Sequence, residues 1–188
     1  MTVGGLVLAA GEGSRFGATK QLAPLWGRPL LSYAVRAMLG VPGITPVVVV
    51  LGHDADAIRE QVDLGDAGVV VCEDWRSGQA ASVRAGLAAL GPVDGAVISL
   101  GDQPFITSQV IAAVLEAAGD GHEAVRATYG GRPGHPVFLG RALLDRAGEL
   151  EGDVGFRELL DGDGVLRLGA EHFCDPMDID TKEELARL

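Results

Sequence analysis

Short apolar runs alternate along the chain with segments in which apolar residues recur every three or four positions. Continuous runs of Val, Ile and Leu are typical of strands buried on both faces of a parallel sheet. The strands predicted in this way are 5–8, 46–51, 68–72, 96–100, 124–128, 136–139 and 165–168.

The segments between these runs carry helix start and stop signals. Pro29 stands at a first-turn position and Gly40 follows the last periodic residue, as expected at the two ends of a helix. Thr181 and Glu184 have the spacing of a capping box. The predicted helices are 29–39, 54–62, 79–90, 107–118, 153–160 and a last one from 181. Such alternation predicts an α/β protein with a doubly wound, mostly parallel sheet and helices on both faces.

Composition narrows the function classes. The 188 residues are 47% hydrophobic and 22% charged, which fits a single domain over 1–188 with a sizeable core. The net charge of -11 argues against binding to nucleic acid or to an anionic membrane. Cys72 and Cys174 match no metal-ligand spacing, and no run reaches the roughly twenty apolar residues that span a bilayer. Without a signal peptide, we expect a cytoplasmic protein.

The first strand opens into the segment Leu8-Ala-Ala-Gly-Glu-Gly-Ser-Arg-Phe-Gly, which ends at Gly17 and is followed by Lys20. Glycines let the backbone approach a ligand closely, and the N–H groups of such a turn form a nest for anions. Arg15 and Lys20 add positive charge. The spacing differs from both the dinucleotide fingerprint and the Walker pattern. An ordinary turn would leave the two cations unexplained, so this loop predicts a nucleotide polyphosphate.

Three carboxylates are candidates for metal binding. Asp102 directly follows the strand 96–100, where a carboxylate can hold a Mg²⁺ ion that bridges phosphates, although Asp before Pro104 is also common in turns. Asp178 and Asp180 share one face of the chain if that segment is extended. If the segment binds metal, one of these two carboxylates is the second ligand. Alternatively, the negative charge of Asp180 stabilises the N-terminus of the following helix.

Two further groups of polar residues are compatible with either a ligand-binding or a structural role. Ser77, Gln79 and Ser82 stand at a predicted helix start, where they can read a base edge or cap the helix. His135 lies between Gly134 and Pro136, where it can face a second substrate or occupy a structural turn. The other histidines show no spacing that would make it a metal ligand.

Taken together, five ordered motifs resemble the MobA-like nucleotidyltransferase family, and most closely its molybdenum cofactor cytidylyltransferase branch. The motifs are Leu8-Ala-Ala-Gly with Arg15-Phe-Gly and Lys20, Gly78-x-x-x-Ser82, Gly101-Asp-x-Pro104, Gly134-His-Pro136 and Asp178-Ile-Asp-Thr181. The resemblance implies the Rossmann-like nucleotide-diphospho-sugar transferase fold, with a nucleotide-binding half (1–104) and an acceptor-binding half (105–188).

The same resemblance implies roles for individual residues. Arg15, Lys20 and Asp102 would be catalytic, Asp102 with Asp180 or Asp178 would bind Mg²⁺ or Mn²⁺, and Gly134 and His135 would face the acceptor. The implied nucleotide-binding residues are Leu8, Ala9, Ala10, Gly11, Glu12, Gly13, Ser14, Arg15, Lys20, Gly78, Gln79, Ser82 and Asp102. Glu12 is unusual in such a loop, because its carboxylate weakens phosphate binding unless it points away from the triphosphate.

The function implied is transfer of CMP from CTP to the terminal phosphate of molybdopterin, with release of pyrophosphate and a molybdoenzyme as recipient of the product. Ala10-Gly11 stands where the guanylyl-transferring branch has Gly-Gly, which favours CTP over GTP. A GTP-dependent enzyme and a transferase acting on a sugar phosphate or another small phosphate remain alternatives. A nucleotide-binding cofactor chaperone and an NAD-dependent oxidoreductase are the alternatives from other classes.

Overall fold

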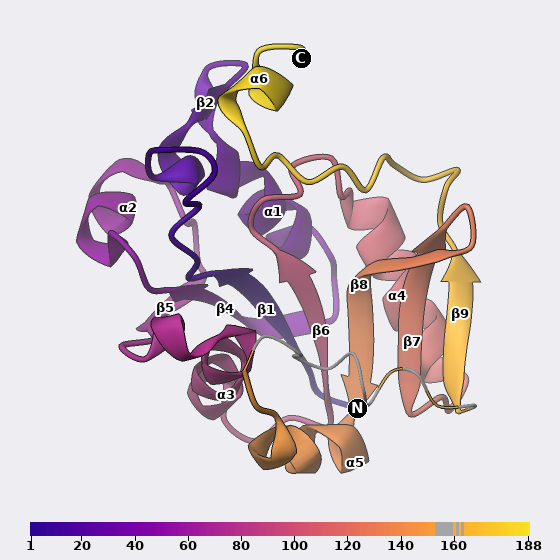
Figure 1. Ribbon diagram of the computed structural model, residues 1–188. Coiled ribbons are helices and arrows are strands. Elements are labelled where there is room, and N and C mark those ends of the chain that lie inside the picture. Colours follow the sequence, from indigo (N-terminus) through magenta and orange to yellow (C-terminus); the bar gives the residue numbers. More distant parts are fainter. Residues whose placement is uncertain (153–159, 161, 163) are drawn as a thin grey trace.

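The computed structural model describes residues 1–152, 160, 162 and 164–188. Within them, seven strands form one sheet in the order β5-β4-β1-β6-β8-β7-β9 (Figure 1). These strands are β1 (Val3–Ala9), β4 (Ile44–Leu51), β5 (Gly68–Val71), β6 (Gly95–Leu100), β7 (Ala124–Tyr129), β8 (Arg132–Gly140) and β9 (Val165–Gly169). The mostly parallel sheet and all seven predicted strand positions are confirmed.

Strand β8 departs from the parallel pattern, because it is antiparallel to both of its neighbours, β6 and β7. The cause is the two-residue connection Gly130-Gly131, in which both glycines have positive φ, 56° and 77°. Turns of this kind join antiparallel strands in tight hairpins. Strand β8 therefore begins at Arg132, and His135, which was expected before the strand, lies within it.

The main predicted helices are also present. They are α1 (Leu30–Leu39), α2 (Ala55–Gln61), α3 (Gln79–Leu90), α4 (Ser108–Gly119) and α6 (Lys182–Leu185). The capping box of α6 is confirmed, since Thr181 and Glu184 exchange both hydrogen bonds. The helix predicted over 153–160 falls largely outside the described residues. Sequence patterns missed α5 (Arg141–Leu144), the 3₁₀ helices η1 (Lys20–Leu22), η2 (Trp75–Ser77) and η3 (Asp145–Glu149), and the short strands β2 (Pro24–Leu25) and β3 (Arg28–Pro29).

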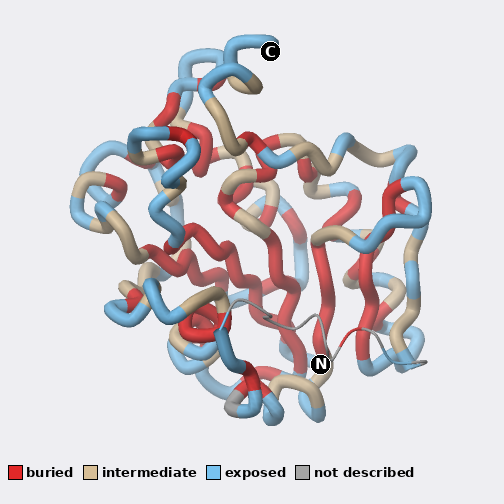
Figure 2. Tube along the Cα trace, in the orientation of Figure 1, coloured by how far each residue is buried: buried red, intermediate tan, exposed pale blue. Residues whose placement is uncertain are grey.

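Apolar side chains of the sheet are buried on both of its faces. Val7 and Ala9 pack in the core that includes α1 and α4, whereas Leu6 and Leu8 pack in the core that includes α3. This follows from the alternation of side chains along a strand, and it explains why the central strands are apolar throughout. Figure 2 shows the sheet as the buried centre of the molecule.

The carboxyl ends of β1, β4 and β6 lie at one edge of the sheet, because these strands run parallel. Strand β8 starts at the same edge. After β9, the chain crosses back along this edge to α6, which lies near the β2–β3 hairpin (Figure 1). Segments far apart in the sequence therefore meet at the edge where open α/β sheets bind their ligands. No helix in the described part of the chain is long and apolar enough to cross a membrane.

Candidate active site

Hydrogen bonds from Gln21 hold the backbone of the glycine loop that follows β1. The Nε2 atom of Gln21, which is 5% exposed, donates hydrogen bonds to the carbonyls of Ala9 and Gly11, each at 2.9 Å. Gly13 adopts φ 63°, and a Cβ there would lie 3.2 Å from the Cβ of Lys20. Glycine at this position thus permits both the turn and the close passage of Lys20. No motif in the sequence singled out Gln21.

A pocket of about 630 Å³ lies between this loop and the start of α3. Its size is within the range of small-molecule sites. The described residues that line it are Leu8, Ala10, Gly11, Glu12, Gly13, Ser14, Trp75, Arg76, Gly78, Gln79, Ser82, Leu100 and Asp102. Most residues expected to bind the nucleotide are therefore brought together, Glu12 among them.

Three of the residues expected at the nucleotide lie outside that lining. Ala9 and Lys20 line a smaller neighbouring pocket, which also includes Asp102. The side chain of Arg15 is 75% exposed and points to Asp180. Ser77, another candidate, donates its hydroxyl to the Asp74 carbonyl and does not line the pocket.

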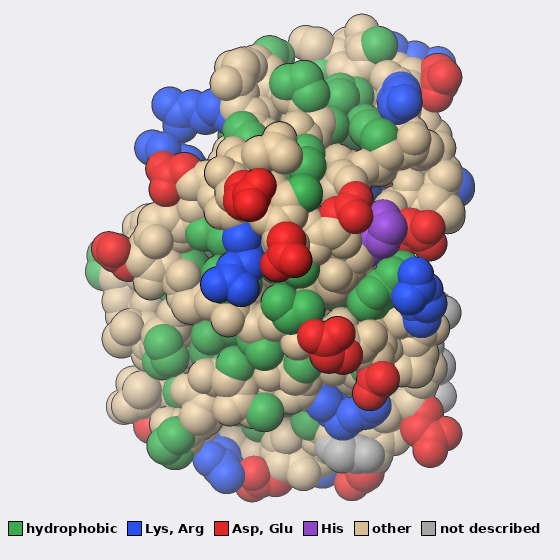
Figure 3. Space-filling view, turned by 90° about the vertical axis from the view of Figure 1, so that its left-hand side faces the viewer, with side chains coloured by type: hydrophobic (Ala, Val, Ile, Leu, Met, Phe, Trp, Pro, Cys, Tyr) green, Lys and Arg blue, Asp and Glu red, His purple; other side chains and the backbone are tan. Residues whose placement is uncertain are grey.

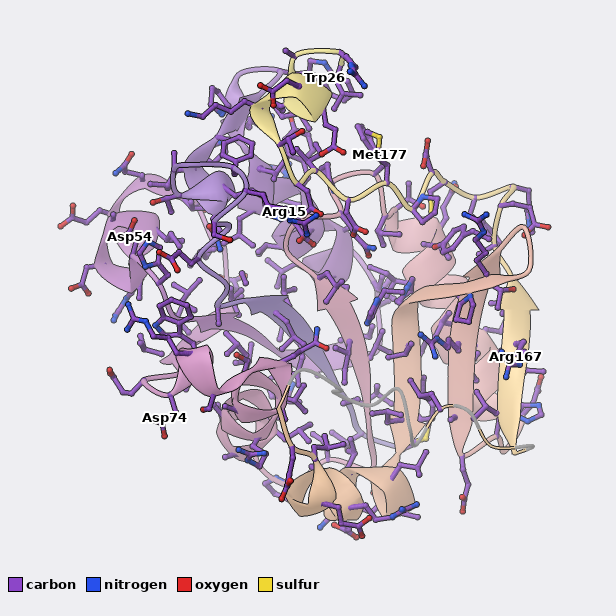
Figure 4. All side chains as sticks on the ribbon, viewed as in Figure 1. Arg15, Trp26, Asp54, Asp74, Arg167 and Met177 are labelled. Carbon is purple, nitrogen blue, oxygen red and sulfur yellow. The ribbon has the colours of Figure 1, made fainter. Side chains whose placement is uncertain are left out.

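Lys20 lies between two of the predicted metal-binding carboxylates. Its Nζ is 2.8 Å from Oδ2 of Asp102 and 3.0 Å from Oδ1 of Asp180. The other carboxylate oxygen of Asp180 is 2.8 Å from Nη2 of Arg15. Figure 4 shows Arg15 at this edge of the sheet, below the chain that carries Met177. These four side chains form an alternating network of charge, which we call the carboxylate cluster (Arg15, Lys20, Asp102 and Asp180).

The carboxylate cluster keeps Lys20 protonated. Burial of Lys20 by itself lowers its pKa, since a charged amine loses water contact. The charge of Asp102 and the hydrogen bonds to Asp102 and Asp180 outweigh that effect, so the pKa of Lys20 is raised above its ordinary value. Lys20 is therefore a permanent cation next to the pocket.

Asp178 and Asp180 have different partners. Oδ1 of Asp178 accepts a hydrogen bond of 2.8 Å from Gln103, and burial, followed by the charge of Asp102, raises the pKa of Asp178. Asp180 is fixed by its own backbone N–H, which donates to Glu184 at 2.8 Å. Asp180, but not Asp178, shares an ion-pair contact with Lys20 that Asp102 also makes.

The two carboxylates of the cluster suit a hard divalent cation. Oδ1 of Asp102 is buried and has no hydrogen-bond partner in the described part of the chain, so one acceptor oxygen is available. Among the same residues, no group of three or more His, Cys, Asp or Glu side chains could form a complete metal cage. Mg²⁺ is commonly held by one or two carboxylates together with substrate phosphates and water, and Asp102 with Asp180 fits that pattern.

His135 and Gly134 lie on β8, outside the pocket lining. Burial, together with the positive charge of Arg126, lowers the pKa of His135 to about 4, against the opposing effect of Asp102. His135 is therefore neutral near pH 7. A Cβ on Gly134 would lie 2.8 Å from the Tyr129 ring, so tight packing accounts for this glycine. Contact of either residue with an acceptor stays a prediction.

Trp75 and Arg76 are pocket residues that were left out of the predicted set. They precede the Gly78-Gln79 motif, and neither is one of the polar residues that typically cap a helix start. Gly52 lies between the Trp75 segment and the glycine loop. A Cβ on Gly52 would lie 2.6 Å from the Ala10 carbonyl and 2.8 Å from the Trp75 side chain, so the two segments are close together. The sequence feature that could have identified them is an aromatic residue followed directly by a cationic one, just before the Gly78-Gln79 motif.

A mostly parallel sheet with a glycine loop, a pocket and paired carboxylates at its carboxyl edge is the arrangement of a nucleotidyltransferase. The model of the MobA-like NTP transferase domain matches residues 5–170. The chain belongs to the MobA-like NTP transferase family.

Comparisons with individual proteins agree on the fold. The structure of Rv0371c from Mycobacterium tuberculosis superposes with a TM-score of 0.87 at 30% identity, covering 100% of this chain and 97% of that one. A nucleotidyl transferase from Methanothermobacter, Mth528, gives a TM-score of 0.80 at 25% identity, covering 99% and 95%. The nucleotide-diphospho-sugar transferase fold implied by the sequence is thereby confirmed.

Among curated relatives, nicotine blue oxidoreductase of Paenarthrobacter nicotinovorans is 33% identical, covering 99% of this chain and 96% of the relative. The bifunctional protein GlmU of Maricaulis maris is 33% identical over 90% of this chain but only 39% of its own length. The sequence similarity thus extends to a protein whose name describes a redox reaction.

Proposed function

We propose that this protein is a cytidylyltransferase that transfers CMP from CTP to the terminal phosphate of molybdopterin and releases pyrophosphate. The observation that carries the proposal is the position of Asp102. It lines the pocket formed by the glycine loop and the start of α3, and it is also held by Lys20 in the carboxylate cluster. A nucleotide in the pocket would thus place its phosphates beside the charged groups needed for phosphoryl chemistry.

In this proposal, a phosphate oxygen of the acceptor attacks the α-phosphorus of CTP in line. One P–O bond forms to the acceptor, the bond from the α-phosphorus to the bridging oxygen breaks, and pyrophosphate leaves with that electron pair. Lys20 and Arg15 offset the charge that develops on the phosphates, and the glycine loop fixes their position. Positioning and charge stabilisation dominate such transfers, so no nucleophilic side chain is required.

Asp102 and Asp180 would hold the divalent ion, Mg²⁺ or Mn²⁺. Such an ion neutralises phosphate charge and polarises the reacting phosphoryl group. A structure of Rv0371c in complex with manganese supports the use of a divalent metal in a similar fold. Lys20 contacts the same two carboxylates, so its positive charge offsets part of theirs.

The substrate assignment rests on residues at the two ends of the site. Ala10, in place of the Gly of the guanylyl branch, lines the pocket and favours CTP. His135 and Gly134 are proposed to face molybdopterin, and a molybdoenzyme is the proposed recipient of the product. GTP transfer and transfer to a sugar phosphate are the alternatives within the same chemistry.

A redox function is the second candidate, because nicotine blue oxidoreductase aligns with nearly the whole chain. It requires binding of a nicotinamide dinucleotide. Asp54 follows β4, the neighbour of β1 in the sheet, but its carboxylate accepts a hydrogen bond from Thr19. Asp54 is also absent from the pocket lining.

A ligand panel tests both candidates. Thermal unfolding is measured with CTP, GTP, ATP, UTP and NAD, each with and without Mg²⁺, because a ligand of the folded state raises stability by mass action. The proposal predicts a selective, Mg²⁺-dependent rise with CTP, followed by equimolar pyrophosphate release when molybdopterin is added. A rise with NAD alone would support the redox candidate, and a rise with GTP alone would assign the guanylyl reaction.

A further inference from the structure

The pocket rim carries an aromatic and a cationic side chain that pack on each other. The guanidinium carbon of Arg76 lies 4.3 Å from the centre of the Trp75 ring, well within the range of a cation–π interaction. On its edge, the same indole meets the ring of His53, with the ring centres 5.5 Å apart. The backbone of Gly52 also passes close to Trp75. Trp75 is thus supported from the glycine-loop side and holds Arg76 over its face.

The charges around the pocket make Arg76 different from the other cations. Among the described lining residues, Glu12 and Asp102 are acidic and Arg76 is the single basic one. Lys20 and Arg15 already have carboxylate partners. Within the described part of the chain, no ion pair involves Arg76, and its partner there is the Trp75 ring.

A triphosphate entering this pocket brings several negative charges to a site that already holds acidic groups. Its first available cation is Arg76, which is exposed and requires no ion pair to break. A guanidinium can donate two parallel hydrogen bonds to a phosphate. On the face shown in Figure 3, acidic and basic side chains are interspersed and form no continuous basic surface, so attraction of the nucleotide depends on individual residues such as Arg76.

We propose that Arg76 binds the triphosphate of the nucleotide and that Trp75 is the positioning residue that holds its guanidinium at the pocket. This inference rests on the proposed nucleotidyltransferase function and adds a residue to its nucleotide site. Trp75 is assigned a role through Arg76 because the guanidinium covers a face of the indole.

Binding of CTP, inorganic tripolyphosphate and cytidine to the full chain tests the assignment. In R76Q, the affinities for CTP and tripolyphosphate should fall about tenfold, the loss of one charge-assisted contact, while the affinity for cytidine is unchanged. KM for CTP should rise with kcat nearly unchanged, as expected for a contact kept throughout the reaction. R59Q removes the same charge from exposed Arg59 on α2, which does not line the pocket, and should bind as wild type does.

The positioning role of Trp75 is tested in the same assay. W75L should weaken tripolyphosphate binding about threefold and W75F less, because Phe retains a ring face for the cation. The double variant W75L/R76Q should bind tripolyphosphate as R76Q does, since the effects of mutating two contacting residues that act together are not additive. If W75L weakens cytidine and leaves tripolyphosphate binding intact, Trp75 stacks on the base and the positioning role is wrong.

The outcomes also separate this inference from the function on which it rests. If the wild type binds CTP and tripolyphosphate, and R76Q binds both with the same affinity as R59Q, the role of Arg76 is wrong. The nucleotidyltransferase proposal would still stand. Wild type that binds no nucleoside triphosphate under any metal condition would overturn both.

Discussion

The carboxylate cluster and the pocket rim hold their cations in opposite ways. Lys20 is 8% exposed and lies between two carboxylates, whereas Arg76 is exposed and rests on an aromatic ring. A buried ion pair fixes a charge in place, and a solvent-exposed cation is free to meet an incoming anion. Under the proposed function, the rim would bind the incoming nucleotide and the carboxylate cluster would stabilise the reacting phosphates.

Removing the charge of Asp102 should have the largest effect, because this residue connects the two regions. We expect D102N to lower kcat about a thousandfold, as the loss of a metal-holding, charge-stabilising group does. Pyrophosphate release measures the rate, and thermal unfolding checks that the variant folds. D66N, a matched change at an exposed site, should retain full activity. Near-normal turnover in folded D102N would contradict the role of the cluster.

Neutralising Lys20 should come next. K20M removes the cation next to Asp102 and Asp180, and we expect kcat to fall about a hundredfold. The signature that distinguishes Lys20 from Arg76 is the parameter affected, since K20M should act on kcat and R76Q on KM. Steady-state kinetics with CTP separates the two. The control K182M removes an exposed lysine on α6. If K182M lowers kcat as much as K20M does, the fall in kcat comes from the loss of one positive charge in general and not from the position of Lys20.

His135 should make the protein sensitive to acid. Its pKa in the folded protein is lowered to about 4 from an ordinary 6.5, so between these values the unfolded chain binds a proton that the folded chain does not. Stability is then lost as the pH falls from 6.5 to 4. Urea unfolding at pH 7 and at pH 4.5 should show that H135Q avoids about 2 kcal/mol of this loss.

Exposed His172 provides the matched control for that measurement. H172Q should lose stability on acidification just as wild type does. If H135Q follows the wild-type curve as well, His135 is protonated in the folded protein and its burial does not govern the acid response.

The smallest effect is expected at the capping box. T181A removes the side-chain acceptor at the start of α6 and should lower the free energy of unfolding by about 1 kcal/mol or less. Activity should stay within about twofold, since the N–H of Asp180 still donates to Glu184. Denaturant unfolding and the pyrophosphate assay measure the two quantities. A large loss of activity would show that Thr181 itself positions Asp180.

The parts of the fold that follow local rules could be predicted from the sequence. The apolar runs located every strand of the sheet, and the Thr181 capping box located α6. The direction of β8 was missed, although Gly130-Gly131 between two strand-like runs is a recognisable hairpin signal. The β2–β3 hairpin is only two residues long on each side, too short for any periodicity.

The site was predictable where one segment carries the chemistry. The glycine loop is continuous in sequence, and Leu8 and residues 10–14 of it line the pocket. The contacts of Gln21 with Ala9 and Gly11, and the choice between Asp178 and Asp180, depend on how distant segments meet. Lys20 and Asp180, for example, are 160 positions apart. A spacing rule within one segment carries no information on such contacts.

A labelled nucleotide followed through one turnover distinguishes CMP transfer from phosphoryl transfer and from binding alone. Enzyme in excess is mixed with Mg²⁺, molybdopterin and CTP labelled at either the α- or the γ-phosphorus, and products are separated after quenching. If CMP is transferred, the α-label appears in the acceptor while the γ-label leaves as pyrophosphate in equal amount. Transfer of the γ-label to the acceptor, or CTP that stays bound and uncleaved, would contradict CMP transfer.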